Sequence, residues 1–92
     1  MRVVVRTRAA LQVQAIFKYI ARDNPAAARR TADAIYDQVE RIAQAGFGYM
    51  GRAGRKPDTR EVTIYPYIIV YKVDPDRDEI VVLSVVHGAR RR

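Results

Sequence analysis

Cysteine is absent from the chain, so neither a disulfide framework nor a thiolate metal site can form. No run of apolar residues approaches the roughly 20 that a membrane-spanning helix needs, and the N-terminus lacks the apolar segment of a signal peptide. The 92 residues suit one domain with one modest core. We therefore expect a single domain, residues 1–92, in the reducing cytoplasm.

Acidic residues are also scarce. The chain has 17 lysines and arginines against 10 aspartates and glutamates, a formal net charge of +7, and arginine far outnumbers lysine. Arginine binds carboxylates and phosphates through two parallel hydrogen bonds, so the charge indicates a phosphate polymer or an acidic peptide as partner. The alternative is a soluble basic protein that has no such partner.

Residues 60–87 contain three short runs rich in Val, Ile, Tyr and Thr, the side chains that suit a packed, pleated sheet. Pro66 separates the first two runs and an acidic turn at 74–78 separates the last two, so the pattern predicts three consecutive antiparallel strands. The last strand, 80–86, has little polar content and is expected to be covered on both faces.

The first half of the chain predicts one strand and two helices. Residues 2–6 are a β-branched run that can pair as an edge strand or beside the last strand. Thr7 can cap a first helix, whose apolar stripe has helical spacing and consists of Leu11, Ala15, Ile16, Tyr19 and Ile20. Asn24 and Pro25 begin a second helix and Gly46 ends it, and its apolar stripe consists of Ala28, Ala32, Ile35, Val39 and Ile42.

The order of elements is therefore strand–helix–helix–three strands. An amphipathic helix must bury its apolar stripe, and the sheet is the only other element available. The sequence predicts an α+β fold, in which a helical hairpin packs on one face of an antiparallel sheet.

The segment 46–59 is rich in glycine and basic residues and forms a long connection, a kind of segment that often carries function. We expect its cations, with one that directly follows the segment and one from the C-terminal end, to form a basic rim that binds a partner. The rim consists of Arg52, Arg55, Lys56, Arg60 and Arg90. The alternative is a mobile connector. A second basic patch would form if the first strand pairs with the last, from residues 90–92 with Arg2, Arg6 and Arg8.

Several segments together resemble the ParE branch of the RelE/ParE toxin superfamily: Gly51-Arg52, Thr59-Arg60-Glu61, the strand Tyr67-Ile-Ile-Val-Tyr71 and the ending Val85-Val86-His87-Gly-Ala-Arg90. The resemblance covers nearly the whole chain. It implies the toxin of a type II toxin–antitoxin pair, of the kind named plasmid stabilisation proteins, which inhibits growth by poisoning DNA gyrase. It also implies a ParD-like antitoxin whose acidic C-terminal segment binds the toxin in a hetero-oligomer, and neither a cofactor nor a metal.

The RelE branch, which cuts messenger RNA on the ribosome, is the first alternative. RelE-like nucleases place an arginine directly after the first tyrosine of the third strand, where this chain has Ile68. If the chain were a ribonuclease, His87 would be the general base, and Arg60 and Arg90 would hold the phosphate. The favoured interpretation of His87 is structural, at the end of the last strand. A second alternative is a non-toxic basic module that binds nucleic acid or a protein.

Three tyrosines of the strands, Tyr65, Tyr67 and Tyr71, allow two interpretations. They could form a platform on which nucleic-acid bases stack. Because an RRM-type motif is absent, the favoured interpretation is that they pack in the core or against the helices.

Overall fold

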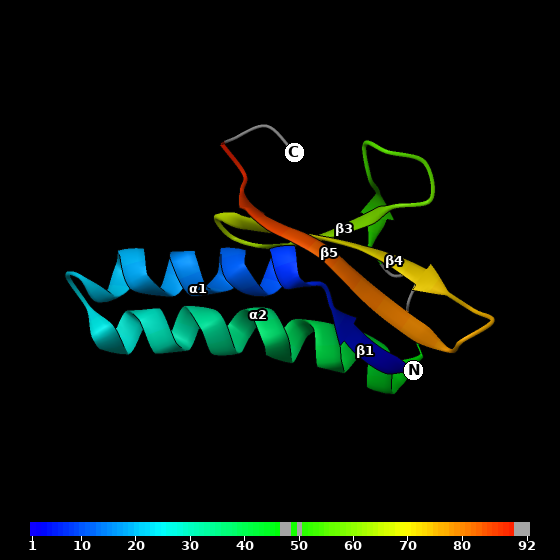
Figure 1. The fold of residues 1–92 in the computed structure, drawn as a ribbon, viewed down its shortest axis with the longest axis horizontal. Helices are drawn as coiled ribbons and strands as arrows, with labels where there is room; N and C mark the ends of the chain where they lie inside the picture. The colour runs from blue at the N-terminus through cyan, green and yellow to red at the C-terminus, as the bar shows by residue number, and fades with distance from the viewer. Residues whose placement is uncertain (47–48, 50, 90–92) are drawn as a thin grey trace.

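The computed structural model of the chain describes residues 1–46, 49 and 51–89 (Figure 1). The described residues form two helices and a five-stranded sheet. In chain order the elements are β1 (Arg2–Val5), α1 (Thr7–Ala21), α2 (Pro25–Ala45), β2 (Arg52–Ala53), β3 (Arg60–Ile64), β4 (Tyr67–Asp74) and β5 (Glu79–His87). The α+β fold and its order of elements are confirmed, and the short strand β2 lies inside the predicted connection.

The second helix begins and ends as its sequence predicts. The Asn24 side chain accepts a hydrogen bond from the Ala27 N–H at 3.0 Å, and Pro25 occupies the first turn. Gly46 ends the helix with φ of +72°, a left-handed conformation that costs glycine nothing because it has no Cβ. The Gly46 N–H donates to the carbonyls of Ala43 and Ile42. These caps satisfy backbone groups that the helix itself leaves unpaired.

The first helix differs from its prediction in two ways. The capping role of Thr7 is wrong, because Arg6 is the extended N-cap residue, without a side-chain cap, and Thr7 is already helical. The predicted apolar stripe is also partly wrong, since Leu11 is 58% exposed and Tyr19 is 71% exposed. Ile16 and Ile20 of the predicted stripe do pack against the core, where they are joined by the buried Ala9 and Val13.

The one-residue connection between β1 and α1 explains both differences. Only Arg6 separates Val5, the last residue of β1, from Thr7, so the strand fixes where the helix starts and how it is rotated. A stripe with the spacing i, i+4, i+7, i+11 starting at Ala9 is as regular as the one predicted. The sequence of the helix alone cannot choose between the two.

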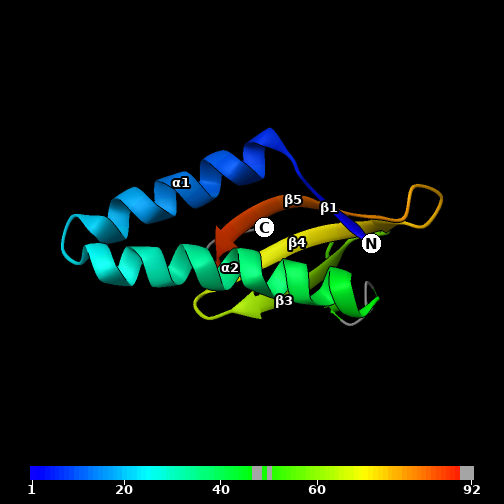
Figure 2. The same cartoon turned by 90° about the horizontal axis from the view of Figure 1, so that it is seen from below.

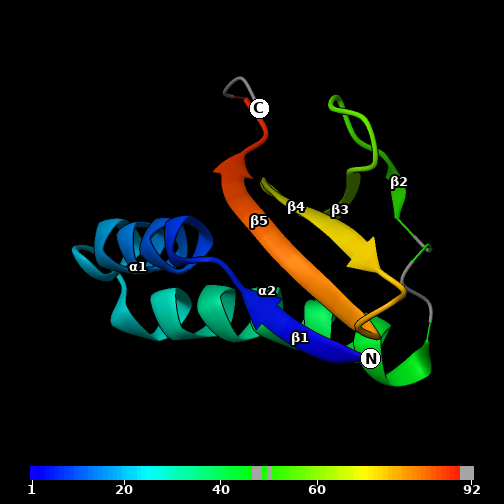
Figure 3. The same ribbon diagram turned by 45° about the vertical axis from the view of Figure 1, so that its right-hand side comes forward.

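The strand order of the sheet is β1-β5-β4-β3-β2. The strand β1 is an edge strand beside β5, as predicted, but it runs parallel to it (Figure 3). The sheet is therefore mixed, and the expectation of a wholly antiparallel sheet is wrong at this strand. Hairpin connections make β3, β4 and β5 antiparallel. Most of the chain separates β1 from β5, so no short turn forces these two strands to run in opposite directions.

Both helices pack on one face of the sheet, and they diverge from the turn that joins them (Figures 1 and 2). Alternate residues of β4 point to this face, so Tyr67, Ile69 and Tyr71 belong to the core. The prediction of a doubly covered last strand holds for its first half. Residues 79–82 are all buried, whereas beyond a bulge only Val85 is.

The face of the sheet without helices carries two cross-strand ion pairs. Arg2 of β1 lies opposite Glu79 and pairs with it, and Arg52 of β2 lies opposite Glu61, with Nε 3.4 Å from Oε1. Each glutamate is nearly fully buried, so each needs a partner for its charge. Both edge strands are thus attached through an arginine. Within the described residues, neither helix is long and apolar enough to cross a membrane.

Candidate binding surfaces

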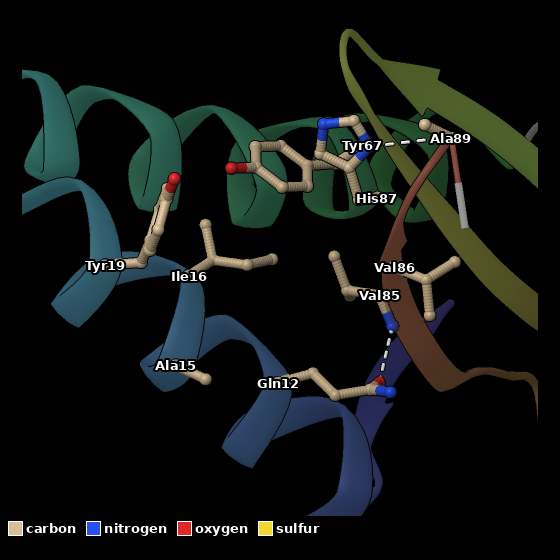
Figure 4. Close-up of a pocket in the computed structure, with 9 residues that line it drawn as sticks. All are labelled: Gln12, Ala15, Ile16, Tyr19, Tyr67, Val85, Val86, His87 and Ala89. Carbon is tan, nitrogen blue, oxygen red and sulfur yellow. Dashed lines mark hydrogen bonds between the residues drawn. The ribbon is translucent and has the colours of Figure 1, made fainter.

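A cleft of about 650 Å³ lies between α1 and the end of the sheet (Figure 4). We call it the apolar cleft, because aliphatic and aromatic side chains dominate its walls. One wall is α1 and the other is the ends of β4 and β5 with the turn that follows. Its lining residues are Gln12, Ala15, Ile16, Tyr19, Tyr67, Val85, Val86, His87 and Ala89.

The apolar cleft exists because β5 extends beyond β1. The pairing of β1 with β5 ends at Val5 and Val82, so the edge of β5 faces α1 from there on. The Val85 N–H donates to the Gln12 side-chain oxygen at 2.8 Å, and this bond attaches the helix to the strand (Figure 4). Sequence reasoning missed Gln12, since nothing in a helical pattern marks a glutamine that caps a distant strand.

The floor of the apolar cleft contains an aromatic pair. The rings of Tyr67 and His87 meet edge to face, with centroids 5.6 Å apart and an interplanar angle of 83°, a favoured aromatic geometry. The His87 Nδ1 accepts a hydrogen bond from the Ala89 N–H at 3.0 Å (Figure 4). One ring nitrogen is therefore engaged in shaping the turn after β5, which agrees with a structural role for this histidine.

The apolar cleft continues onto an exposed surface of α1. Tyr19 and Ala15 line the cleft, and both are exposed although they are apolar or aromatic. A surface of this kind, bounded by polar residues, is typical of a contact site for another chain. The volume lies within the roughly 300–1,000 Å³ of ordinary ligand sites. The arrangement can bury apolar side chains, but its described lining residues include no cluster of charges that could perform acid–base chemistry.

A second, smaller groove lies on the opposite face of the sheet. We call it the cationic groove, because Arg8 of α1 approaches Arg55 and Lys56 of the connection across β3, β4 and β5. Its volume is about 110 Å³. The remaining lining residues are Thr59, Glu61, Val70, Leu83 and Ser84.

The structure divides the predicted basic rim. Arg55 and Lys56 line the cationic groove, and Arg52 lies nearby through its ion pair with Glu61. Arg60 does not join them, because consecutive strand residues point to opposite faces and Glu61 takes the groove side. Arg90, with the rest of 90–92, lies outside the described residues. Arg8, which the sequence suggested for another patch, takes the place of Arg60.

Arg60 instead holds the connection against the core. Its side chain donates to the Gly51 carbonyl and lies over the Tyr49 ring, with Cζ 5.6 Å from the centroid. The Gly51 N–H donates to the Tyr71 hydroxyl at 3.1 Å. A Cβ at residue 51 would lie 2.5 Å from the Glu61 carbonyl oxygen, so only glycine allows this close approach.

Two residues of the ribonuclease alternative, His87 and Arg60, are not brought together, and the third, Arg90, lies outside the described residues. On β4, His87 pairs with Tyr67 and Arg60 pairs with Tyr71. These partners are four residues apart, so His87 and Arg60 are separated by roughly 13 Å along the strand direction. Ile68, where RelE-like nucleases carry arginine, is 5% exposed. A general base and a phosphate-binding cation need to reach the same phosphate, and these two do not.

Two of the three strand tyrosines are core residues, as the favoured interpretation predicted. Tyr71 is 1% exposed and Tyr67 is 8% exposed. Tyr65, which is 91% exposed, lies in the turn between β3 and β4. The three rings do not share one exposed face, so they do not form a stacking platform.

The α+β fold is the one seen in structures of the RelE/ParE kind. Residues 3–92 match the family described as the ParE toxin of the type II toxin–antitoxin system parDE, and the chain belongs to that family. Among curated proteins, the one named "Putative toxin Y4kP" of Sinorhizobium fredii is 35% identical over 83 residues, which is 88% of this chain and 81% of that protein.

Solved structures from two toxin–antitoxin systems have the same fold. The chromosomal ParDE toxin–antitoxin system of P. aeruginosa matches with a TM-score of 0.81 and 23% identity, covering 95% of each chain. The intact RelBE toxin–antitoxin complex of E. coli matches with a TM-score of 0.67 and 14% identity over 98% of each chain. At these identities the likeness to the solved structures establishes the fold alone.

Proposed function

We propose that the chain is a growth-inhibiting toxin that poisons DNA gyrase in the cytoplasm, and that a ParD-like antitoxin with an acidic C-terminal segment silences it. The observation that carries the proposal is membership of the ParE family over residues 3–92. The similarity to the ParDE system of P. aeruginosa supports a partner of the ParD kind. The net charge of +7 suits an acidic partner and a target that is engaged with DNA.

The apolar cleft is the surface at which we expect the antitoxin to bind. A segment that folds on binding gains affinity by burying apolar side chains, which offsets the entropy that it loses. The cleft offers such a surface, from Tyr19 on α1 to His87 at the end of β5. Acidic residues of the same segment would be attracted by the net charge of +7 of the chain, so the affinity should fall as salt screens this attraction. A dissociation constant that does not change with salt would contradict the electrostatic part.

The positions of the basic residues favour gyrase poisoning over ribonuclease activity. His87 faces the apolar cleft and Arg60 lies at the other end of the neighbouring strands, against the connection. Ile68 supplies no positive charge where RelE-like nucleases have one. This separation argues against a nuclease site that combines His87 with Arg60.

The test combines an enzyme assay with a cellular one. Purified chain is added to gyrase, plasmid DNA and ATP, and the reaction is stopped with detergent and protease. We expect linear plasmid to accumulate, because a poisoned gyrase leaves its DNA cut. In cells that express the chain, we expect DNA-damage signalling with intact messenger RNA. Messages cut at codon boundaries, shown by primer extension, together with unaffected gyrase, would overturn the proposal in favour of the RelE alternative. Normal growth on strong expression without any antitoxin would favour the non-toxic module.

A further inference from the structure

We propose that the cationic groove binds the phosphodiester backbone of nucleic acid. This inference rests on the proposed function only in one respect, which is that gyrase as target makes DNA the nucleic acid concerned. The groove itself is defined by three cations, Arg8, Arg55 and Lys56, on the face of the sheet that no helix covers (Figure 1).

The three cations are available to a ligand. All three residues are exposed, and among the residues that the structure describes no carboxylate lies within ion-pair distance of their side chains. The acid in the groove, Glu61, is 2% exposed and has Arg52 as an ion-pair partner at 3.4 Å. The groove is therefore positive where a ligand would touch it, and its one negative charge is compensated.

The position of Arg8 adds to this potential. It stands in the first turn of α1, which has no acidic residue and no side-chain cap. The first turn of a helix carries the positive end of the helix dipole and unpaired N–H groups. Both contributions have the same sign as the three side chains. The groove thus concentrates positive charge that comes from segments almost 50 residues apart in the sequence.

The chemistry of the walls favours a nucleic acid over an acidic peptide. A peptide that folds on binding needs apolar surface to bury, and the groove offers only Val70 and Leu83, which are half-buried. A nucleic acid gains affinity mainly from its phosphates and the counterions that they release. Hydroxyl groups also serve as phosphate contacts, and Thr59 and Ser84 lie in the groove.

The size of the groove agrees with a polymer that passes over it. Its volume of about 110 Å³ lies well below the roughly 300–1,000 Å³ of sites that enclose a small molecule. A single phosphate group can enter while the sugars and bases stay outside. The groove would then read charge and spacing rather than base sequence, because phosphate contacts carry no sequence information directly.

Fluorescence anisotropy tests the proposal with a labelled single-stranded oligonucleotide of about 20 nucleotides, longer than the roughly 4–16 nucleotides that one small binding domain covers. The variant is Arg8→Ala/Arg55→Ala/Lys56→Ala. The matched control, Lys18→Ala/Arg29→Ala/Arg30→Ala, removes the same charge from exposed helix positions outside the groove. Affinity is measured over a range of salt concentrations, and thermal melts verify that both variants fold.

We expect the control to keep the salt dependence of the parent chain. In the groove variant, the slope of log affinity against log salt should become shallower by about 2, since each phosphate contact to a single strand contributes roughly 0.7. Equal losses in both variants would mean that only net charge matters and would overturn the proposal. No loss in the groove variant would overturn it as well. If the triple variant does not fold, the salt dependence of affinity is measured for Arg55→Glu, a single change in the exposed connection.

A second arm distinguishes nucleic acid from acidic peptide. Poly-glutamate of matched length and charge is added as a competitor of the oligonucleotide. The proposal predicts weak competition, and poly-glutamate that displaces the oligonucleotide at equal charge concentration would assign the groove to an acidic peptide instead. Because no gyrase or antitoxin is present in either arm, the result is independent of the gyrase assay, and either proposal can fail alone.

Discussion

Replacing Tyr19 by alanine should weaken antitoxin binding about ten- to forty-fold and leave the free chain as stable as before. The side chain is 71% exposed, so folding gains little from it. A surface substitution away from special features usually changes stability by no more than about 0.5 kcal/mol. In the complex, the same ring would lie against the bound segment, because it lines the apolar cleft.

The magnitude follows from the exposed area. A tyrosine buries roughly 150–250 Å², and if the antitoxin covers half of the 71% that is exposed, about 50–90 Å² leave water. At roughly 25 cal/mol per Å², this area is worth about 1.3–2.2 kcal/mol. A factor of ten in affinity corresponds to about 1.4 kcal/mol, which gives the expected range.

Isothermal titration calorimetry with the purified antitoxin measures the effect, and we expect that antitoxin to be the product of the neighbouring reading frame. Tyr36→Ala is the matched control, since Tyr36 is an exposed tyrosine of α2 that does not line the cleft. The control should bind as the parent does. If Tyr19→Ala binds as tightly as the parent, or if both variants weaken equally, the assignment of the antitoxin to the apolar cleft is wrong.

Three further substitutions test the account of stability by thermal unfolding, where 1 kcal/mol shifts the midpoint of a domain of this size by roughly 4–8 °C. Ile69→Ala should cost about 2–5 kcal/mol, because Ile69 is fully buried and leaves a cavity; a loss below 1 kcal/mol would mean that the core is loosely packed. Tyr71→Phe should cost about 1–3 kcal/mol, because the Gly51 N–H loses its acceptor, and an unchanged midpoint would show that this bond does not hold the connection. Gln12→Ala removes the acceptor of the Val85 N–H and should cost about 1 kcal/mol, which a stability equal to that of the parent would contradict.

Local signals in the sequence predicted the elements that they control. Asn24, Pro25 and Gly46 cap the second helix as predicted, because each acts on backbone groups within a few residues. Pro66 marks the turn between β3 and β4 for the same reason. The order of elements and the α+β class followed from such signals together with the hydrophobic pattern.

Relations between distant segments could not be read in the same way. The rotation of α1 depends on its one-residue connection to β1, so the exposure of Leu11 and Tyr19 was predicted wrongly. The parallel pairing of β1 depends on the path of the whole chain. The grouping of Arg8 with Arg55 depends on how the sheet brings the start of α1 near the connection.

The basic rim shows how one strand can divide a cluster that is continuous in sequence. Arg60 and Glu61 are neighbours along β3, yet they point to opposite faces of the sheet. The beginning of β3 was predicted at Arg60, but the face of each residue depends on which side the helices cover. The adjacent opposite charges of Arg60 and Glu61 in a predicted strand are the sequence signal that could have predicted this division.

Hydrogen–deuterium exchange of the chain, measured alone and with its antitoxin, tests the central claim most directly. The account predicts slower exchange on binding in peptides from 12–19 and 85–89, which form the two walls of the apolar cleft, and little change around the cationic groove at 55–59. Protection confined to 55–59, with the cleft segments exchanging as in the free chain, would contradict it.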